Sequence, residues 1–487
     1  MRPRIHNDAL RPITEAIDAA TTYEEWRAAA AAWDALSGAA DWRRAPGPQH
    51  YDAAGLQAAI HTWQDRRAAG DPWGLADALD THLRRHLPDL ADPALYAVAR
   101  TGPPLAVEAF LDAAEAALLD LVDRLVPPAA LREAQTRLTA QAHLFGRSAL
   151  LLSGGATWGF HHLGVVKALF FATLLPPILS GASTGAMIAA GVCTRDDTAL
   201  RAMFADLGQL RRDGLRPVGL VAGLRARAML APEQLTEVLQ HNIGDYTFAE
   251  AHARSGRVLN ISVSSPRRLG KPRLLTHLTT PDVLVARAAL ASAALPGLFP
   301  PVALRQRPPG GVEAPAWPGE LWVDGSLQAD LPKQQLARLH NVNHFIVSQT
   351  NPHVLPFAHD QVGAGRGRQA LAAVASAAWS QGSIAAELVQ RAGQGLPGRL
   401  GTLSAQAHHL LRQDYHGDIE LHPPLRMGMI PKLVSNPTPT ELAQYVLDGE
   451  RTVWPHLTRL RDHTRIARAF ATAAQRLRAR LDAIAAP

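Results

Sequence analysis

Residues 181–185 read Gly-Ala-Ser-Thr-Gly, between an apolar run at residues 174–180 and a run of small residues at 186–191. This order predicts a β-strand, a tight turn and a helix, with Ser183 at the apex of the turn. Glycines on both sides let the backbone turn sharply, so that the serine hydroxyl stands exposed above a sheet. The turn also directs the first N–H groups of the helix toward the place where a carbonyl would react. The pentapeptide alone occurs by chance in roughly one chain in ten of this length, so its context decides the interpretation.

A second glycine-rich segment lies upstream. A short apolar run at residues 149–152 leads into Ser-Gly-Gly-Ala-Thr-Trp-Gly at residues 153–159, and a helical pattern follows. The glycine spacing fits two kinds of site, a dinucleotide-binding loop or an oxyanion hole that serves Ser183. A dinucleotide site requires an acidic residue about twenty positions on, at the end of the next strand. That strand ends at Ser183 without an acid, so the sequence favours an oxyanion hole, in which glycine leaves N–H groups unshielded.

A serine nucleophile needs a base, and Asp324 is the candidate. It ends a short strand pattern at residues 320–324, and strand ends are where α/β folds place their working residues. Asp324 would either accept the serine proton itself or orient a histidine, in the chain order Ser, Asp, His. The candidate histidines are His340, His344 and His353. His344 lies in an apolar strand pattern and His353 in a turn, so His353 is the better placed, and the spacing leaves the dyad and the triad open.

Together these motifs resemble those of the patatin-like lipid acyl hydrolases, and within that superfamily the triacylglycerol lipases of the yeast and plant-seed type. The supporting stretches lie at residues 163–170, 295–301, 341–349, 415–419, 435–439 and 449–451. The region around Tyr23, Leu36 and Trp42 is similar to the helical, lipase-associated region that precedes the patatin domain in those lipases. The similarity covers most of the chain, from about residue 20 to about residue 460.

The resemblance implies a patatin-like three-layer α/β/α fold with a mainly parallel sheet, a helical N-terminal domain before it and a helical tail after it. It also implies a Ser–Asp catalytic dyad, with Ser183 as nucleophile and Asp324 as base, and no catalytic histidine, metal or cofactor. The oxyanion hole would be formed by Gly154, Gly155 and Ala156. The elbow and motif glycines are Gly159, Gly181, Gly185 and Gly325.

One departure from the family pattern lies in the glycine-rich loop. Most patatins carry a third glycine and a basic residue there, where this chain has Ala156 and Trp158. Alanine still presents its N–H, and the absence of the basic residue favours neutral acylglycerols over charged phospholipids. The predicted function is therefore hydrolysis of acylglycerol esters in lipid catabolism. The alternatives are a patatin-type phospholipase A or lysophospholipase, a Ser-Asp-His esterase that uses His353, and a non-catalytic lipid-binding protein.

The composition agrees with a cytoplasmic or peripherally membrane-associated protein. The 487 residues are 47% hydrophobic and carry a formal net charge of +6, and Cys193 is the one cysteine, so no disulfide forms within the chain. No apolar region follows the charged start at residues 1–8, and no uninterrupted apolar stretch approaches the length of a membrane span, so we expect neither a signal peptide nor a transmembrane helix. The scattered basic residues have no accompanying motif, which argues against a nucleic-acid partner. We expect a lipid substrate, met at a membrane or lipid-droplet surface.

Proline and glycine clusters divide the chain into four parts. Residues 1–145 are alanine-rich with a helical pattern. Residues 146–350 alternate short apolar strands with helical stretches, which is typical of a three-layer α/β domain. Residues 351–455 complete the catalytic region and include a candidate lid. Residues 456–487 predict a basic amphipathic helix, which either lies on an anionic lipid surface or packs by its apolar stripe, and the small residues of that stripe favour packing.

Overall fold

The computed structural model describes residues 7–45, 51–125, 127–219, 228–266, 271–352, 354, 415–424 and 431–485. The chain forms two compact units, one of Met1–Arg147 with Val453–Pro487 and the other of Ser148–Thr452. His353 and nearly all of the segment 354–405, where we expect a lid, lie outside the described residues.

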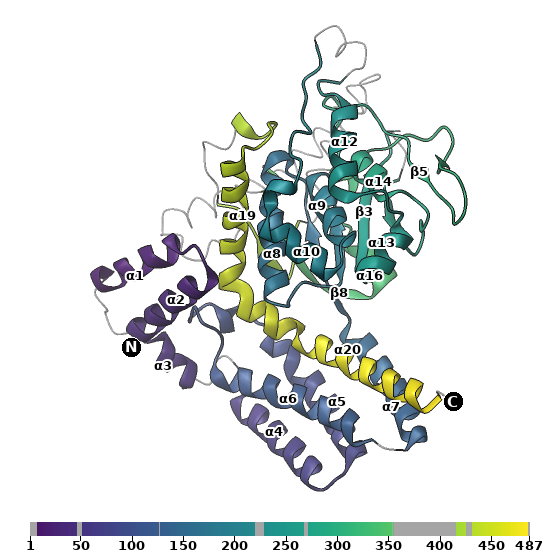
Figure 1. The fold of residues 1–487 in the computed structure, drawn as a ribbon. Coiled ribbons are helices and arrows are strands. Elements are labelled where there is room, and N and C mark those ends of the chain that lie inside the picture. Colours follow the sequence, from purple (N-terminus) through teal and green to yellow (C-terminus); the bar gives the residue numbers. More distant parts are fainter. Residues whose placement is uncertain are drawn as a thin grey trace, which may run out of the picture. The chain divides into compact units, whose positions relative to one another are not determined.

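Within the described residues, the second unit is built on a seven-stranded sheet in the order β4-β3-β2-β1-β8-β9, with β7 paired to β3. Figure 1 labels β3 and β8 of this sheet. The strands are β1 Arg147–Leu152, β2 Ile178–Gly181, β3 Val258–Ser264, β4 Arg273–Thr276, β7 Val323–Asp324, β8 Val342–Ser348 and β9 Ile419–Leu421. β1, β2 and β3 run parallel, as do β8 and β9, while β4 and β7 run antiparallel to β3. A small hairpin pairs β5 Arg305–Gln306 with β6 Ala314–Pro315.

The central strands are buried on both faces because helices cover the sheet. All residues of β2 and β3 are buried, the pattern of strands in a parallel sheet with two covered sides. The helices of this unit are α8 His161–Phe171, α9 Thr184–Cys193, α10 Asp197–Ala205, α12 Pro232–Ile243, α13 Phe248–Ser255, α14 Val285–Ser292, α15 Ser326–Ala329, α16 Lys333–His340 and α19 Pro439–Val453. α9 packs on β2 and β3, α14 on β3, and α16 on β8. The predicted α/β fold class is therefore confirmed.

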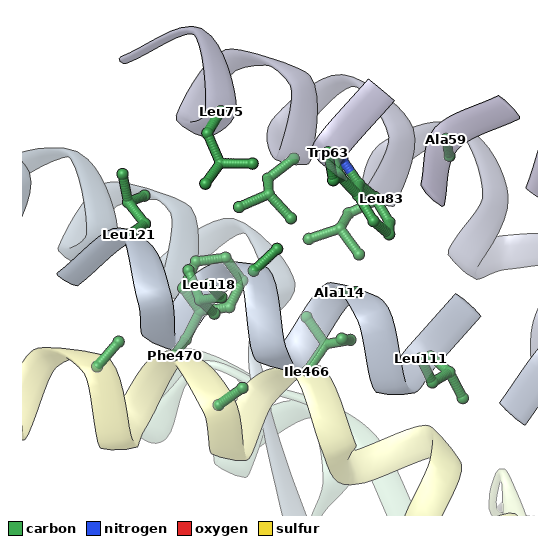
Figure 2. Close-up of a cluster of buried hydrophobic side chains, with 14 of the residues drawn as sticks. Ala59, Trp63, Leu75, Leu83, Leu111, Ala114, Leu118, Leu121, Ile466 and Phe470 are labelled. Atoms are coloured by element: carbon green, nitrogen blue, oxygen red, sulfur yellow. The ribbon is translucent and has the colours of Figure 1, made fainter. Parts of the chain in front are cut away.

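The first unit is helical, as its sequence pattern predicts. Its helices are α1 Asn7–Ala19, α2 Tyr23–Ser37, α3 Ala39–Arg44, α4 Ala53–Ala68, α5 Pro72–Leu90, α6 Leu105–Arg124, α7 Pro128–Phe145 and α20 Leu457–Ala485. Side-chain caps start three of them, from Thr22, Asp52 and Asp71. Figure 2 shows the buried cluster that α4, α5, α6 and α20 share, including Trp63, Leu83 and Leu118. In the described ranges, each helix of the molecule is too short or too polar to cross a bilayer.

The C-terminal helix α20 packs against α6 and α7 through its apolar stripe. Ile466 and Phe470 point into the helical core in Figure 2, and both are buried. Its arginines pair with acids of α6: Arg465 Nε lies 2.6 Å from Glu115 Oε2, and Arg476 Nη1 lies 2.8 Å from Asp123 Oδ2. Of the two interpretations of this basic helix, packing onto neighbouring helices is the one that the contacts support.

Candidate active site

Ser183 stands at the turn between β2 and α9, in a backbone conformation that is rare for serine. Its φ of +52° and ψ of −124° lie outside the regions that L-residues favour, which is a form of stored strain. The Ser183 N–H donates to Ser292 Oγ at 3.0 Å, and Ser292 Oγ donates to Ser262 O at 2.8 Å. A Cβ at Gly181 or Gly185 would lie closer than 3.0 Å to backbone atoms, so both positions require glycine. The expected strand, turn and helix are present, and neighbouring elements hold the turn in place.

Asp324 lies at the end of β7, and only 2% of it is exposed. β7 pairs with β3, and this pairing places the carboxyl close enough to the Ser183 side chain for that hydroxyl to lower its pKa. The N–H and the hydroxyl of Ser326 both donate to Asp324 Oδ1, each at 2.8 Å. Gly325 leaves no room for a side chain, because a Cβ there would lie closer than 3.0 Å to Ser262 O. The structure therefore brings together the serine and the acid that the motifs single out.

The Asp324 carboxyl has an unusual acidity. Burial raises its pKa to about 6, and the hydrogen bonds from Ser326 and Ser183 oppose that rise by stabilising the ionised form. A carboxyl with a pKa near 6 is ionised at neutral pH and is a stronger base than an exposed aspartate. It can therefore accept a proton from a neighbouring hydroxyl.

The glycine-rich loop lies directly against the turn at Ser183. A Cβ built on Gly154 would lie 3.4 Å from Ser183 Cβ. Gly154 donates its own N–H to Asp330 Oδ1 at 2.9 Å. Within the described residues, the N–H groups of Gly155 and Ala156 have no acceptor in the protein. Of these two residues, Ala156 also lines the cavity at Ser183.

Ala156 begins the short 3-10 helix Ala156–Phe160 at the position where most patatins carry glycine. Its φ of +47° lies in the left-handed region, which is about 1–2 kcal/mol less favourable for alanine than for glycine. Thr184 Oγ1 donates to Ala156 O at 2.8 Å and ties the loop to the start of α9. Gly159 makes room for this contact, because a Cβ there would lie closer than 3.0 Å to the Thr184 side chain.

A buried hydrogen-bond network holds the loop from behind. The Thr350 N–H donates to Ser153 Oγ at 2.8 Å, and Thr350 Oγ1 donates to Gly154 O at 2.9 Å. His162 joins Ser348 Oγ at 2.7 Å through Nδ1 and Ser153 O at 3.0 Å through Nε2. Burial lowers the pKa of His162 to about 4, so the ring is neutral at physiological pH. The network gives the loop a defined position before any ligand binds.

Asp330 is a second buried carboxyl of the site, and no motif in the sequence indicates it. Its Oδ2 accepts from Asn351 Nδ2 at 2.7 Å, while Oδ1 holds the Gly154 N–H. Burial and the nearby charge of Asp324 raise its pKa to about 7, against the effect of these hydrogen bonds. The one signal in the sequence is an acid within the apolar-rich stretch after Gly325. Only the folded chain shows that it anchors the glycine-rich loop.

The two candidate histidines within the described residues make hydrogen bonds to residues other than Asp324. His344 Nδ1 lies 3.0 Å from Ser148 Oγ, and His340 Nε2 lies 2.8 Å from Asn260 Oδ1. His353, the better placed candidate for a triad, lies outside the described residues. In the part of the chain that the structure describes, no group of three or more His, Cys, Asp or Glu side chains is arranged to hold a metal ion.

A cavity of about 150 Å³ opens at Ser183. Ala156 and Thr184 line it next to the serine, and α9 and α12 form two of its walls. Most of its lining is hydrocarbon, contributed by Leu163, Met187, Ile188, Val192, Leu235, Val238, Leu239, Leu298 and Phe299. Such a lining suits an extended apolar chain.

A mostly parallel sheet between helices, a strained serine turn and an apolar cavity that opens at the serine define the class of the molecule, a lipid acyl hydrolase of the α/β type. The family model described as patatin-like phospholipase matches residues 150–337. A second model, described as a domain of unknown function (DUF3336), matches residues 6–141.

Three relatives carry the comparison further. The triacylglycerol lipase ptl3 of Schizosaccharomyces pombe is 30% identical over 470 residues, which are 94% of this chain and 96% of that protein. Triacylglycerol lipase 4 of Saccharomyces cerevisiae is 28% identical over 481 residues, 91% of this chain and 51% of the relative. The triacylglycerol lipase SDP1L of Arabidopsis thaliana is 31% identical over 461 residues, 90% of this chain and 55% of the relative.

The chain belongs to the patatin-like lipase family. It spans nearly the whole fission-yeast relative and about half the length of the other two. The family resemblance seen in the motifs is thereby confirmed, and so is the assignment to the lipid ester hydrolases.

Proposed function

We propose that this chain hydrolyses the carboxylic esters of acylglycerols, with Ser183 as the nucleophile and Asp324 as its base. The observation that carries the proposal is the closeness of the Ser183 side chain to the buried Asp324 carboxyl, whose pKa it lowers, beside an apolar cavity that Ser183 lines. The cavity would hold an acyl chain while the ester carbonyl lies over Ser183. The printed names of the relatives, which are triacylglycerol lipases, support an acylglycerol as the substrate.

The proposed reaction has two halves. Ser183 Oγ attacks the ester carbonyl carbon while Asp324 takes the hydroxyl proton, and the carbonyl electron pair moves onto oxygen. The tetrahedral intermediate collapses, the bond to the glycerol oxygen breaks, and Asp324 returns the proton to that oxygen. Water then attacks the acyl carbon of acyl-Ser183 and gives its proton to Asp324. Collapse of the second intermediate releases the fatty acid, and the proton goes back to Ser183 Oγ.

The negative charge of both intermediates needs donors that are already in place. The open N–H groups of Gly155 and Ala156 are suited to this role, and the Gly154 N–H orients the loop through Asp330. Because the network behind the loop is buried, the donors need no rearrangement when the charge develops.

Neutral acylglycerols are favoured over phospholipids by the chemistry of this loop. Its position 158, where most patatins have a basic side chain, holds Trp158, which is 3% exposed. The loop therefore offers no cation to a phosphate group. A patatin-type phospholipase A activity is the alternative that the substrate comparison below separates.

We also propose that the protein meets its substrate at the surface of a membrane or lipid droplet, as a peripheral protein of the cytoplasm. Val434 lines the cavity and is 46% exposed, which places an apolar side chain at the edge of the site. An exposed apolar residue at the cavity suits contact with a lipid surface.

The first experiment compares two substrates. Purified protein is assayed for fatty-acid release from an emulsified long-chain triacylglycerol and from phosphatidylcholine vesicles, with Ser183→Ala and Asp324→Asn as controls. We expect release from the triacylglycerol, and its loss in both variants. His353→Ala should retain most of this activity, because the proposed dyad needs no histidine.

Three outcomes would change the proposal. Preferential release from phosphatidylcholine would reassign the chain as a phospholipase. Near-complete loss in His353→Ala would replace the dyad with a Ser-Asp-His triad. Activity that survives Ser183→Ala would remove Ser183 from the mechanism.

A further inference from the structure

One line of residues along α9 differs from the rest of the helix. Ser183, Met187, Gly191 and Arg195 are partly exposed, at intervals of four residues, and every other position from 184 to 194 is buried. A spacing of four places these residues on one face of the helix, one above the other. All four line the cavity. The open, partly exposed face of α9, a helix labelled in Figure 1, therefore begins at the nucleophile and follows the helix toward its C-terminal end.

Gly191 lies on this line without a packing reason to be glycine. A Cβ built there would meet Arg195 Nη1 at 3.6 Å and Asn242 O at 4.0 Å, which are ordinary contacts. Every other glycine within the described helices would bring its Cβ closer than 3.0 Å to a neighbouring atom; these are Gly55, Gly74, Gly159, Gly164, Gly185, Gly208 and Gly449. Glycine is also unfavourable in a helix interior compared with alanine. The fold leaves the absence of a side chain at 191 unexplained, whereas an open cavity wall explains it.

We propose that the open face of α9 is the bed of the substrate's acyl chain and that Gly191 sets how long a chain it accepts. This inference rests on the proposed ester hydrolysis at Ser183. The substrate class that follows is an ester of a long, extended, unbranched acyl group.

The length of the bed follows from helix geometry. From Ser183 to Gly191 the helix rises ~12 Å, and from Ser183 to its last residue, Cys193, ~15 Å. An extended hydrocarbon advances about 1.3 Å per carbon–carbon bond, from the bond length and the tetrahedral angle. Gly191 thus lies roughly nine bonds from the reacting carbon, and the helical part of the face holds about eleven.

The cavity wall opposite α9 and the end of the cavity near Arg195 are consistent with binding of an acyl chain along α9. Leu235, Val238 and Leu239 of α12 line the cavity with hydrocarbon. At the far end, Arg195 Nη1 donates to Gly191 O at 2.7 Å, which places a guanidinium where the apolar face stops. A chain that fills the bed would end near that group.

The test is a chain-length profile of Gly191→Leu. We measure kcat/KM for p-nitrophenyl butyrate, octanoate and palmitate with the wild type, Gly191→Ala and Gly191→Leu. We expect Gly191→Leu to lose about tenfold or more on palmitate while butyrate stays within about twofold, because only the long chain reaches position 191. Gly191→Ala should lie between the other two proteins. Met187→Phe blocks the bed one turn earlier, so its loss should already appear with octanoate.

An unchanged palmitate-to-butyrate ratio in folded Gly191→Leu would overturn the inference, and so would an equal loss on both esters. If Gly191→Leu does not fold, as judged by circular dichroism, the ratio in Gly191→Ala decides by the same criterion. If the wild type cleaves none of the esters, the proposed function fails on its own. The bed is then tested by displacement of a fluorescent fatty acid: Gly191→Leu should weaken palmitate about tenfold or more and leave octanoate unaffected, and equal affinities would overturn it.

Discussion

The pKa of Asp324 determines how the proposed dyad responds to pH. The base acts only when it is ionised, and burial raises its pKa to about 6. We therefore expect kcat/KM on a soluble ester to fall about tenfold per pH unit below that value and to level off above it. Ser326→Ala removes a donor to Asp324 Oδ1, which should raise the pKa and move the acid limb to higher pH. A wild-type profile that stays flat down to pH ~4.5 would show that another group limits the rate.

The same carboxyl should lower the stability of the fold at neutral pH. Its folded-state pKa of about 6 lies above the ordinary aspartate pKa of 3.8, so its contribution to stability is present below the lower value and is lost as pH rises through about 6. The loss amounts to about 3 kcal/mol at most. Asp324→Asn should therefore abolish activity and raise Tm at pH ~8, with a gain that shrinks at pH ~4. Thermal unfolding at both pH values checks this, and an equal gain at both would exclude the ionisation as its cause.

Asp330 should act on the reaction through the glycine-rich loop. Asp330→Ala leaves the Gly154 N–H without its acceptor, so the neighbouring Gly155 and Ala156 donors lose their orientation. We expect kcat to fall on the order of a hundredfold with little change in KM, because a misplaced oxyanion donor affects the transition state. Asp330→Asn retains an oxygen acceptor and should recover most of the rate. If Asp330→Asn is as slow as Asp330→Ala, or if Asp330→Ala stays within about twofold of wild type, the loop does not depend on this contact.

At the level of secondary-structure elements, α20 belongs to the core of the helical unit. Phe470 is 4% exposed, and its ring stacks on Phe145 of α7 with centroids 5.0 Å apart. Phe470→Ala should lower the free energy of unfolding of this unit by about 3–5 kcal/mol, through lost burial and a residual cavity. Denaturant unfolding followed by circular dichroism measures the change.

A matched control for this variant lies in the same unit. Leu144 of α7 is 58% exposed, so Leu144→Ala removes a large apolar side chain that is not in the core. We expect a change within about 0.5 kcal/mol. Equal effects of the two substitutions would mean that α20 contributes no more to stability than a surface helix.

For the whole molecule, the helical unit depends on both ends of the chain. Residues up to 147 form it together with residues from 453 onward, and the sheet unit lies between them in sequence. A chain that ends at Thr452 loses Ile466, Phe470 and Leu477 from the helical core. We expect α6 and α7 to become rapidly cleavable by protease in that truncation, because their apolar faces lose a covering helix. Protection equal to that of the full chain would show that the N-terminal helices fold without α20.

The turn at Ser183 could be predicted from the sequence because it depends on neighbouring residues alone. A glycine on each side of a serine, after an apolar strand and before small residues, predicts the turn because the neighbouring backbone atoms allow no side chain at Gly181 or Gly185. The fold class could also be predicted from the sequence. Short apolar segments, typical of buried strands, alternate along the chain with segments of helical periodicity. Asp324 was a candidate from its strand end, and its role as the base stays a prediction that the assays above test.

The amino-acid sequence alone was thus sufficient for the α/β class, the family and the turn at Ser183, because these depend on short-range patterns of glycine and apolar residues. The pairing of Ser183 with Asp324 was expected from the motifs, whereas the burial of Asp324, the anchoring of Gly154 by Asp330 and the open face of α9 are seen only in the folded chain. Each depends on sheet order and on burial, which bring together residues far apart in sequence and change their acidity. The docking of α20 on α6 and α7 has the same origin, since an apolar stripe indicates that a helix is covered and does not indicate by what.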